Sequence, residues 1–144
     1  MLMPDVNILV YAHRADEKTH RAHRRWLEDA LNGPQPVALS MLVAVGFLRI
    51  VTNPRIYASP TPASSAIAIV EEICAQPTCR TVGPGPDHLK RVLELCRLVS
   101  ATGKLVADAQ HAALAISEGC TWVTRDGDFA RFVPHGLSLR HLEL

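Results

Sequence analysis

Apolar residues recur along most of the chain at the spacing i, i+3, i+4, i+7, which is the pattern of a helix with one buried face. The clearest example is Lys18–Leu31, where apolar residues fall on one side of the predicted helix and basic residues fall elsewhere. The same spacing, with capping or breaking residues at the ends, predicts four further helices. They are expected at Met41–Thr52, from Thr61 and Pro62 to just before Pro77, from Asp87 to Val99, and at Leu105–Glu118.

Short apolar runs lie between the predicted helices and indicate strands. A first strand ends near Asp5 and a turn of helix follows it; the other strands are expected at Pro36–Ser40, Arg80–Val82, Thr121–Thr124 and Leu137–Leu139. Strands that alternate with helices predict an α/β fold with a mainly parallel sheet covered on both faces. A length of 144 residues leaves room for one such domain, which we expect to span residues 1–144.

Composition narrows the class of protein. Hydrophobic residues make up 48% of the chain and charged residues 20%, which is typical of a folded globular protein. The net charge is only +1, so nucleic-acid binding would depend on local patches of positive charge. No apolar run reaches the roughly 18 residues that span a bilayer, and Asp5 stands where a signal peptide would carry basic residues. We therefore expect a cytoplasmic protein with no membrane segment.

The cysteines give no sign of a disulfide framework. None belongs to a C-x-x-C pair, and all lie in apolar segments, which predicts small buried side chains in a reducing compartment. These residues are Cys74, Cys79, Cys96 and Cys120.

Three aspartates occupy positions where α/β proteins collect ligands. Asp5 and Asp126 each follow a predicted strand, and the carboxyl ends of parallel strands meet at one edge of the sheet. Asp108 lies in the first turn of a helix that is apolar on nearly every face, so we expect this helix to be largely buried. A carboxylate on such a helix needs a partner charge or strong hydrogen bonds. Carboxylates gathered in one place repel each other unless a divalent cation holds them, and their hard oxygens suit Mg²⁺ or Mn²⁺.

Each aspartate also has an ordinary structural interpretation. Asp5 would cap a helix that begins near Asn7, and Asp108 would favour the positive N-terminus of its own helix. Asp126 and Asp128 would form a solvated turn. These alternatives stay open for each residue taken alone, although together the three acids are harder to explain separately.

Four stretches of the chain together resemble the PIN domain, and in particular the VapC toxins of bacterial toxin–antitoxin pairs. They are Asp5–Asn7 (DVN), Phe47–Arg55 (FLRIVTNPR), Ala107–Ala115 (ADAQHAALA) and Val123–Phe129 (VTRDGDF). Each stretch is short, but their order over essentially the whole chain is specific. The resemblance implies a single α/β/α domain that cleaves RNA with Mg²⁺, or with Mn²⁺, held by acidic residues.

The resemblance also implies roles for individual acids. Asp5, Asp108 and Asp126 match the catalytic, metal-binding acids of the family, and Asp128 is similar to an auxiliary acid of some members. One position departs from the pattern, because the second acid of the family falls at Gly46, which offers no side chain. Two small polar residues match positions that support the metal ligands, and these are Asn7 and Thr124.

Basic side chains are the candidates for holding the RNA. Arg125 lies where, by resemblance, it would contact a phosphate. Residues 20–25 form the only dense basic run, whose Arg24 and Arg25 would guide phosphates toward the acids or simply form a solvated helix face. His111, three residues after Asp108, would shuttle a proton or, more simply, bond to the backbone or to solvent.

Partners and alternatives follow from the same resemblance. The family implies a small VapB-type antitoxin that covers the acidic site, and a homodimer. A different class is a PIN-like module that binds RNA or protein without catalysis, which Gly46 favours. A phosphotransfer enzyme of the haloacid dehalogenase type would need an acid at Asn7, and a zinc site at His20 and His23 lacks a third ligand nearby. A phosphate-binding loop at Gly103 and Lys104 fails because the flanking residues do not fit that motif.

Overall fold

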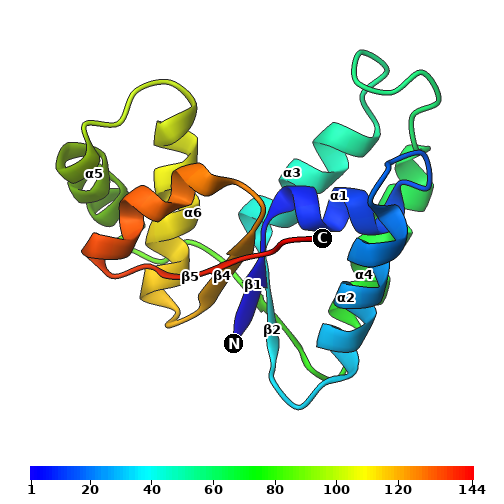
Figure 1. Ribbon diagram of the computed structural model, residues 1–144, viewed down its shortest axis with the longest axis horizontal. Coiled ribbons are helices and arrows are strands. Elements are labelled where there is room, and N and C mark those ends of the chain that lie inside the picture. Colours follow the sequence, from blue (N-terminus) through cyan, green and yellow to red (C-terminus); the bar gives the residue numbers. More distant parts are fainter.

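The computed structural model describes all 144 residues, and its centre is a sheet of five strands in the order β3-β2-β1-β4-β5 (Figure 1). All neighbouring strands run parallel, so the predicted mainly parallel sheet is confirmed. The strands are β1 (Leu2–Pro4), β2 (Val37–Ser40), β3 (Cys79–Val82), β4 (Thr121–Thr124) and β5 (Ser138–His141). Because β1 and β4 are direct neighbours, the chain segments that follow them leave the sheet side by side.

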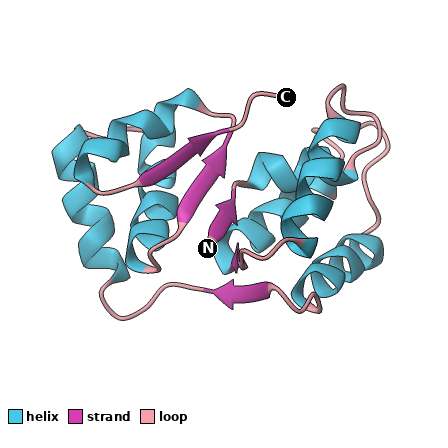
Figure 2. Ribbon diagram, turned by 60° about the horizontal axis from the view of Figure 1, so that its bottom comes forward, coloured by secondary structure: helices cyan, strands magenta, loops and turns pink.

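Two groups of helices cover the sheet. They are α1 (Val6–His13), α2 (His20–Asn32), α3 (Met41–Val51), α4 (Ala63–Cys74), α5 (His88–Val99), α6 (Lys104–Ser117) and the 3₁₀ helix η1 (Gly127–His135). Figure 1 shows α5, α6 and η1 on one side of the strands and α1 to α4 on the other, and the turned view of Figure 2 shows the same separation. The predicted α/β/α arrangement is therefore confirmed.

Aromatic side chains in the core fix the loop that follows β4. Trp122 of β4 is fully buried, and its ring lies 5.1 Å from the ring of Phe129 on η1. Phe129 in turn packs 6.2 Å from Phe132, which is also buried. Since Trp122 precedes the loop and Phe129 follows it, this packing holds both ends of the segment that carries Asp126.

The helices follow the predicted boundaries closely, with three differences. The segment after Asp5 forms a helix of eight residues rather than a single turn. The helix expected at Leu105–Glu118 begins at Lys104, and its first turn is exposed, with Val106 at 43%, so the prediction of burial on nearly every face is wrong there. The helix η1 was not predicted, because the segment lacks a helical apolar rhythm and contains Pro134.

The prediction that the cysteines are buried is confirmed for two of the four. Cys79 and Cys120 are buried as predicted, but Cys96 is only half-buried and Cys74 is exposed; none is in a disulfide. None of the helices combines the length and the low polarity that a bilayer crossing requires.

Candidate metal centre

Asp5 lies at the carboxyl end of the central strand, where it has two roles at once. Its Oδ1 accepts a hydrogen bond of 2.6 Å from the backbone N–H of Val6, so it does cap α1. Its Oδ2 accepts a 2.6 Å hydrogen bond from the hydroxyl of Thr124 at the end of β4. Asp5 is 7% exposed, and these bonds hold its carboxylate in one orientation at the edge of the sheet.

Thr124 connects Asp5 to the acids that follow β4. The backbone N–H of Asp126 donates a 3.0 Å hydrogen bond to the Thr124 hydroxyl oxygen. Asp126 then accepts a 2.9 Å bond from the backbone N–H of Asp128, which makes Asp126 the cap of η1. The supporting role predicted for Thr124 therefore has a geometric basis, because one hydroxyl group contacts both Asp5 and Asp126.

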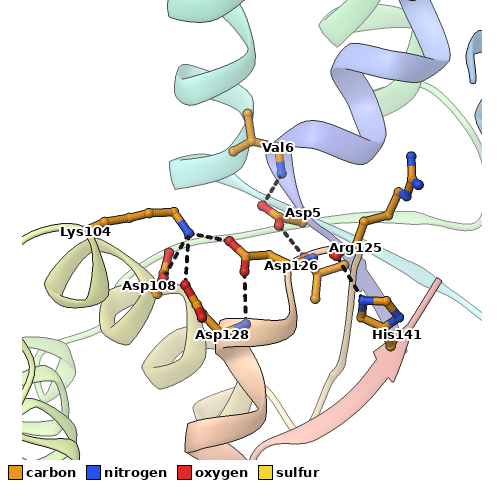
Figure 3. A network of polar contacts seen from close by, with 9 residues as sticks. Asp5, Val6, Lys104, Asp108, Arg125, Asp126, Asp128 and His141 are labelled. Carbon is orange, nitrogen blue, oxygen red and sulfur yellow. Dashed lines mark hydrogen bonds and ion pairs between the residues drawn. The ribbon is translucent and has the colours of Figure 1, made fainter. Parts of the chain in front are cut away.

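Asp108 comes to the same edge from α6. One oxygen from each of Asp108, Asp126 and Asp128 lies within 4.8 Å of the others (Figure 3). Asp108 is buried, Asp126 is half-buried and Asp128 is exposed, so the cluster opens to solvent on one side. Three hard carboxylate oxygens at this spacing fit a divalent cation of the Mg²⁺, Ca²⁺ or Mn²⁺ kind.

Lys104, the first residue of α6, is a member of this centre that the sequence analysis missed. Its ammonium group forms ion pairs with Asp126, with Asp108 at 3.4 Å and with Asp128 at 3.9 Å. Lys104 lies one residue before the helix predicted at Leu105–Glu118, whereas the structure begins this helix at Lys104. The available signal was its spacing of four residues from Asp108, which puts both side chains on one face of a helix.

Burial and Lys104 act in opposite directions on the acids. Burial raises the pKa of Asp5 and of Asp108, because it disfavours the charged form. Burial would also raise the pKa of Asp126, but the hydrogen bonds from Lys104 and from the Asp128 N–H outweigh it and lower this pKa below its usual value. The hydrogen bond to Asp126 raises the pKa of Lys104, so the ammonium group stays charged at neutral pH.

Gly46 on α3 faces the first residue of α1. A Cβ atom at Gly46 would lie 3.1 Å from Cγ2 of Val6, the residue after Asp5. Gly46 also lines a cavity of about 530 Å³ between α1, α3 and α6, together with Asn7 and Gln110. Asn7 is exposed at the rim of this cavity, and its side chain is not among the hydrogen-bond partners of Asp5.

The predicted RNA-contacting arginines are not all at the acidic edge. Arg125 directly precedes Asp126, and its guanidinium donates a 3.4 Å hydrogen bond to Thr19 at the start of α2. Arg24 forms an ion pair of 2.9 Å with Glu28 and lines a separate cavity between α1, α2 and α4. Arg25 is exposed on α2. The structure therefore places Arg125 beside Asp126 in the chain, but its guanidinium points toward α2 and away from the acids (Figure 3), while Arg24 and Arg25 lie on α2 itself.

His111 is half-buried and packs against the core. Its ring stacks on Trp122 with 5.3 Å between ring centres, and its Nδ1 is buried without a hydrogen-bond partner. The expected bond to backbone or solvent is thus not made at Nδ1. Burial lowers the pKa of His111 to about 4, so the ring is neutral at pH 7.

Comparisons with known proteins identify the family and the fold. Residues 2–133 match the PIN domain family. Ribonuclease VapC31 of Mycobacterium tuberculosis is 41% identical over 142 residues, which cover 99% of this chain and 97% of the relative. VapBC2 of Rickettsia felis, solved with a DNA fragment from its promoter, superposes with a TM-score of 0.69 and 18% identity over 99% and 98% of the two chains. VapC20 of Mycobacterium tuberculosis, described as a Sarcin-Ricin loop cleaving toxin, gives a TM-score of 0.66 and 19% identity over 97% and 99%.

Proposed function

The chain belongs to the PIN domain family and, within it, to the VapC ribonucleases, and from this premise we propose that it hydrolyses RNA phosphodiester bonds with a divalent metal ion. The observation that carries the proposal is the acidic cluster at the carboxyl edge of the sheet. Four acids from three separate segments converge there, and a module without catalysis has no need of that convergence.

The metal would be held by Asp108, Asp126 and Asp128, with Asp5 beside them. Mg²⁺ is the ion we propose, with Mn²⁺ as a substitute, because both prefer oxygen ligands and keep several waters. When bound, such an ion supplies Lewis acidity for the scissile phosphate and for a nucleophilic water.

The side chains around the acids set their orientation and receive the substrate. Thr124 holds the Asp5 carboxylate through a hydrogen bond, and its bond to the Asp126 N–H fixes the turn that carries Asp126. Asn7, at the rim, would add a further polar contact to this support. Arg125 is the nearest proposed contact for RNA phosphate, while Arg24 and Arg25 would act only on more distant parts of the strand.

The test of the proposal is RNA cleavage by the purified protein with Mg²⁺, compared with Asp108→Asn and Asp5→Asn. Each substitution removes one carboxylate, so we expect cleavage to fall at least a hundredfold while the fold is kept. Asp29→Asn, an exposed residue on α2, is the matched control and should cleave like the wild type. Wild-type cleavage by Asp108→Asn would refute its assignment, and no cleavage by any protein would favour the non-catalytic module.

We also propose the partners and the compartment. The solved relatives include VapBC toxin–antitoxin complexes, so we expect a VapB-type antitoxin to cover the acidic edge, in the cytoplasm, with a homodimer as the assembled form. Expression of the chain alone should slow growth, and co-expression of the product of the adjacent gene should restore it. Normal growth with folded protein present in the native host would contradict the toxin role.

A further inference from the structure

Lys104 holds a position that is unusual for a helix of this kind. It is the first residue of α6, directly after Gly103, which has a φ of +57°. A cation at a helix N-terminus is opposed by the partial positive charge of that end. The placement of Lys104 therefore needs another source of stabilisation, and the carboxylates at its ammonium group supply it.

One ammonium group serves the whole cluster. The ion pairs of Asp108, Asp126 and Asp128 all go to Lys104, which thus connects α6 with the segment after β4 (Figure 3). Arg125 is the nearest other cation in sequence, but its guanidinium bonds to Thr19 instead. Lys104 is therefore the counter-ion that the acids use within the chain itself.

From these contacts we propose that Lys104 is an internal counter-ion that a divalent cation must displace in order to bind. The proposal rests on the metal site of the proposed function and adds its regulation. A divalent cation and an ammonium group repel each other strongly when they share the same carboxylate oxygens. The two are thus alternative occupants of one position, and the chain sets a threshold of metal concentration for its own activity.

The exchange requires the movement of one side chain only. The Lys104 side chain is 64% exposed and flexible, so it has a route into solvent. The Asp108 side chain is 9% exposed, and Asp126 is held by the N–H of Asp128. The carboxylates of Asp108 and Asp126 therefore stay in place while the ammonium group leaves, and the exposed Asp128 carboxylate is free to follow either cation.

The decisive experiment is calorimetric titration with Mn²⁺ of the wild type and of Lys104→Met, which keeps a long unbranched side chain and removes its charge. We expect Lys104→Met to bind Mn²⁺ roughly tenfold more tightly at low ionic strength, because the competing cation is gone. Lys104→Arg keeps the charge and adds a guanidinium that pairs with carboxylates, so it should bind Mn²⁺ no more tightly than the wild type. Lys90→Met, at an exposed position on α5, is the matched control and should leave the affinity unchanged.

Thermal unfolding separates this role from a merely structural one. In EDTA, Lys104→Met should melt below the wild type, because its carboxylates have lost their counter-ion. With saturating Mn²⁺ the difference should close or reverse, whereas a structural lysine would lower the melting temperature equally in both conditions. Lys104→Gln provides a second uncharged variant should the Met variant fold poorly.

The outcomes distinguish the two proposals. Equal or weaker Mn²⁺ binding by the uncharged variants overturns the counter-ion role, even when the wild type cleaves RNA. Tighter binding by these variants supports the role, even when no RNA is cleaved and the ribonuclease function fails. A wild type that binds no Mn²⁺ at millimolar concentration, with uncharged variants that also bind none, overturns the inference as well.

Discussion

Gly46 lies in the middle of α3, where an added Cβ would press on Val6 at 3.1 Å. Glycine inside a helix costs about 1 kcal/mol of stability relative to alanine. A side chain at Gly46 would therefore stabilise α3 through its helix propensity, and the close contact with Val6 would offset part of this gain. We expect Gly46→Glu to place a carboxylate in the neighbourhood of Asp5 and to lower the Mg²⁺ concentration that gives half-maximal cleavage. The measurement is a metal titration of the cleavage rate.

Gly46→Ala is the matched control, because it tests the space beside Val6 without adding a ligand. An unchanged metal requirement in the Glu variant, with loss of cleavage in Asp128→Asn, would show that Asp128 fills the role of the missing acid. Loss of activity in both Gly46 variants would show that the cavity beside Gly46 must stay open.

His111 makes stability depend on pH, through the stacked ring in the core. Burial lowers its pKa to about 4, whereas an exposed histidine titrates near 6.5. Below pH 6.5 His111 therefore binds a proton in the unfolded chain but stays neutral in the folded chain. The free energy of unfolding consequently decreases as the pH falls toward 4. The loss is about 3 kcal/mol over this window, from about 1.4 kcal/mol per pKa unit.

His111→Phe keeps a ring on Trp122 and removes the titrating group together with its unpartnered Nδ1. We expect this variant to lose less stability than the wild type between pH 7 and pH 4.5, measured by urea unfolding. The buried His23 and the carboxylates contribute equally to both proteins, so the comparison isolates His111. Equal losses in the two proteins would contradict the assignment.

The acids of the site could be predicted from the sequence, whereas Lys104, the cation that pairs with them, could not. Asp5 and Asp126 follow strands, and that position alone sends them to one edge of a parallel sheet. Lys104 was not predicted because the glycine before it indicates a break in the helix. Two of its partners, Asp126 and Asp128, also lie 22 and 24 positions away in the sequence. Spacing of four residues to Asp108 was the one local sign of its role.

At the scale of elements, caps decide where the helices beside the site begin. The Ser40 hydroxyl accepts hydrogen bonds from the N–H groups of Leu42 and Val43, at 3.2 and 3.4 Å, and Ser40 is buried. Ser40→Ala should therefore cost about 1 kcal/mol of unfolding free energy. Asp87 stands at the corresponding position of α5, but its side chain makes no cap hydrogen bond. Asp87→Ala should therefore lower the unfolding free energy by only a few tenths of about 1 kcal/mol. Equal losses in urea unfolding would show that cap hydrogen bonds do not set these boundaries.

Helical rhythm and breaking residues predicted most elements, and their failures have physical causes. Phe129 and Phe132 of η1 pack into the core. A 3₁₀ helix has three residues per turn, so its apolar residues do not follow the α-helical spacing used for the prediction. The first turn of α6 is apolar yet exposed, because it projects past the end of the sheet toward the acidic edge. Periodicity shows which residues share a face, and it does not show whether another element covers that face.

At the scale of the whole molecule, the site joins parts of the chain that are far apart in sequence. Asp5 and Thr124 are separated by 119 positions, and their hydrogen bond exists only because β1 and β4 are neighbours in the sheet. The alternation of strands and helices predicts a parallel sheet, but it does not give the strand order. The order β3-β2-β1-β4-β5, which makes β1 and β4 neighbours, comes from the structure alone.

A metal ion bound to this centre would stabilise the entire fold, because the unfolded chain has no assembled site. At a metal concentration a hundred times the dissociation constant, the gain in unfolding free energy is about 2.7 kcal/mol, which raises the melting temperature by several degrees.

Asp108→Asn should differ from the wild type both without metal and with it. Without metal it should be more stable than the wild type, since burial raises the pKa of Asp108 and the charged form destabilises the folded chain at neutral pH. With Mn²⁺ it should gain little, because a ligand is missing. Asp29→Asn, exposed on α2, should keep the wild-type response. The measurement is thermal unfolding in EDTA and in a series of Mn²⁺ concentrations. A metal-dependent rise in Asp108→Asn as large as that of the wild type would place the ion elsewhere in the molecule, and the acidic edge would no longer explain the metal requirement.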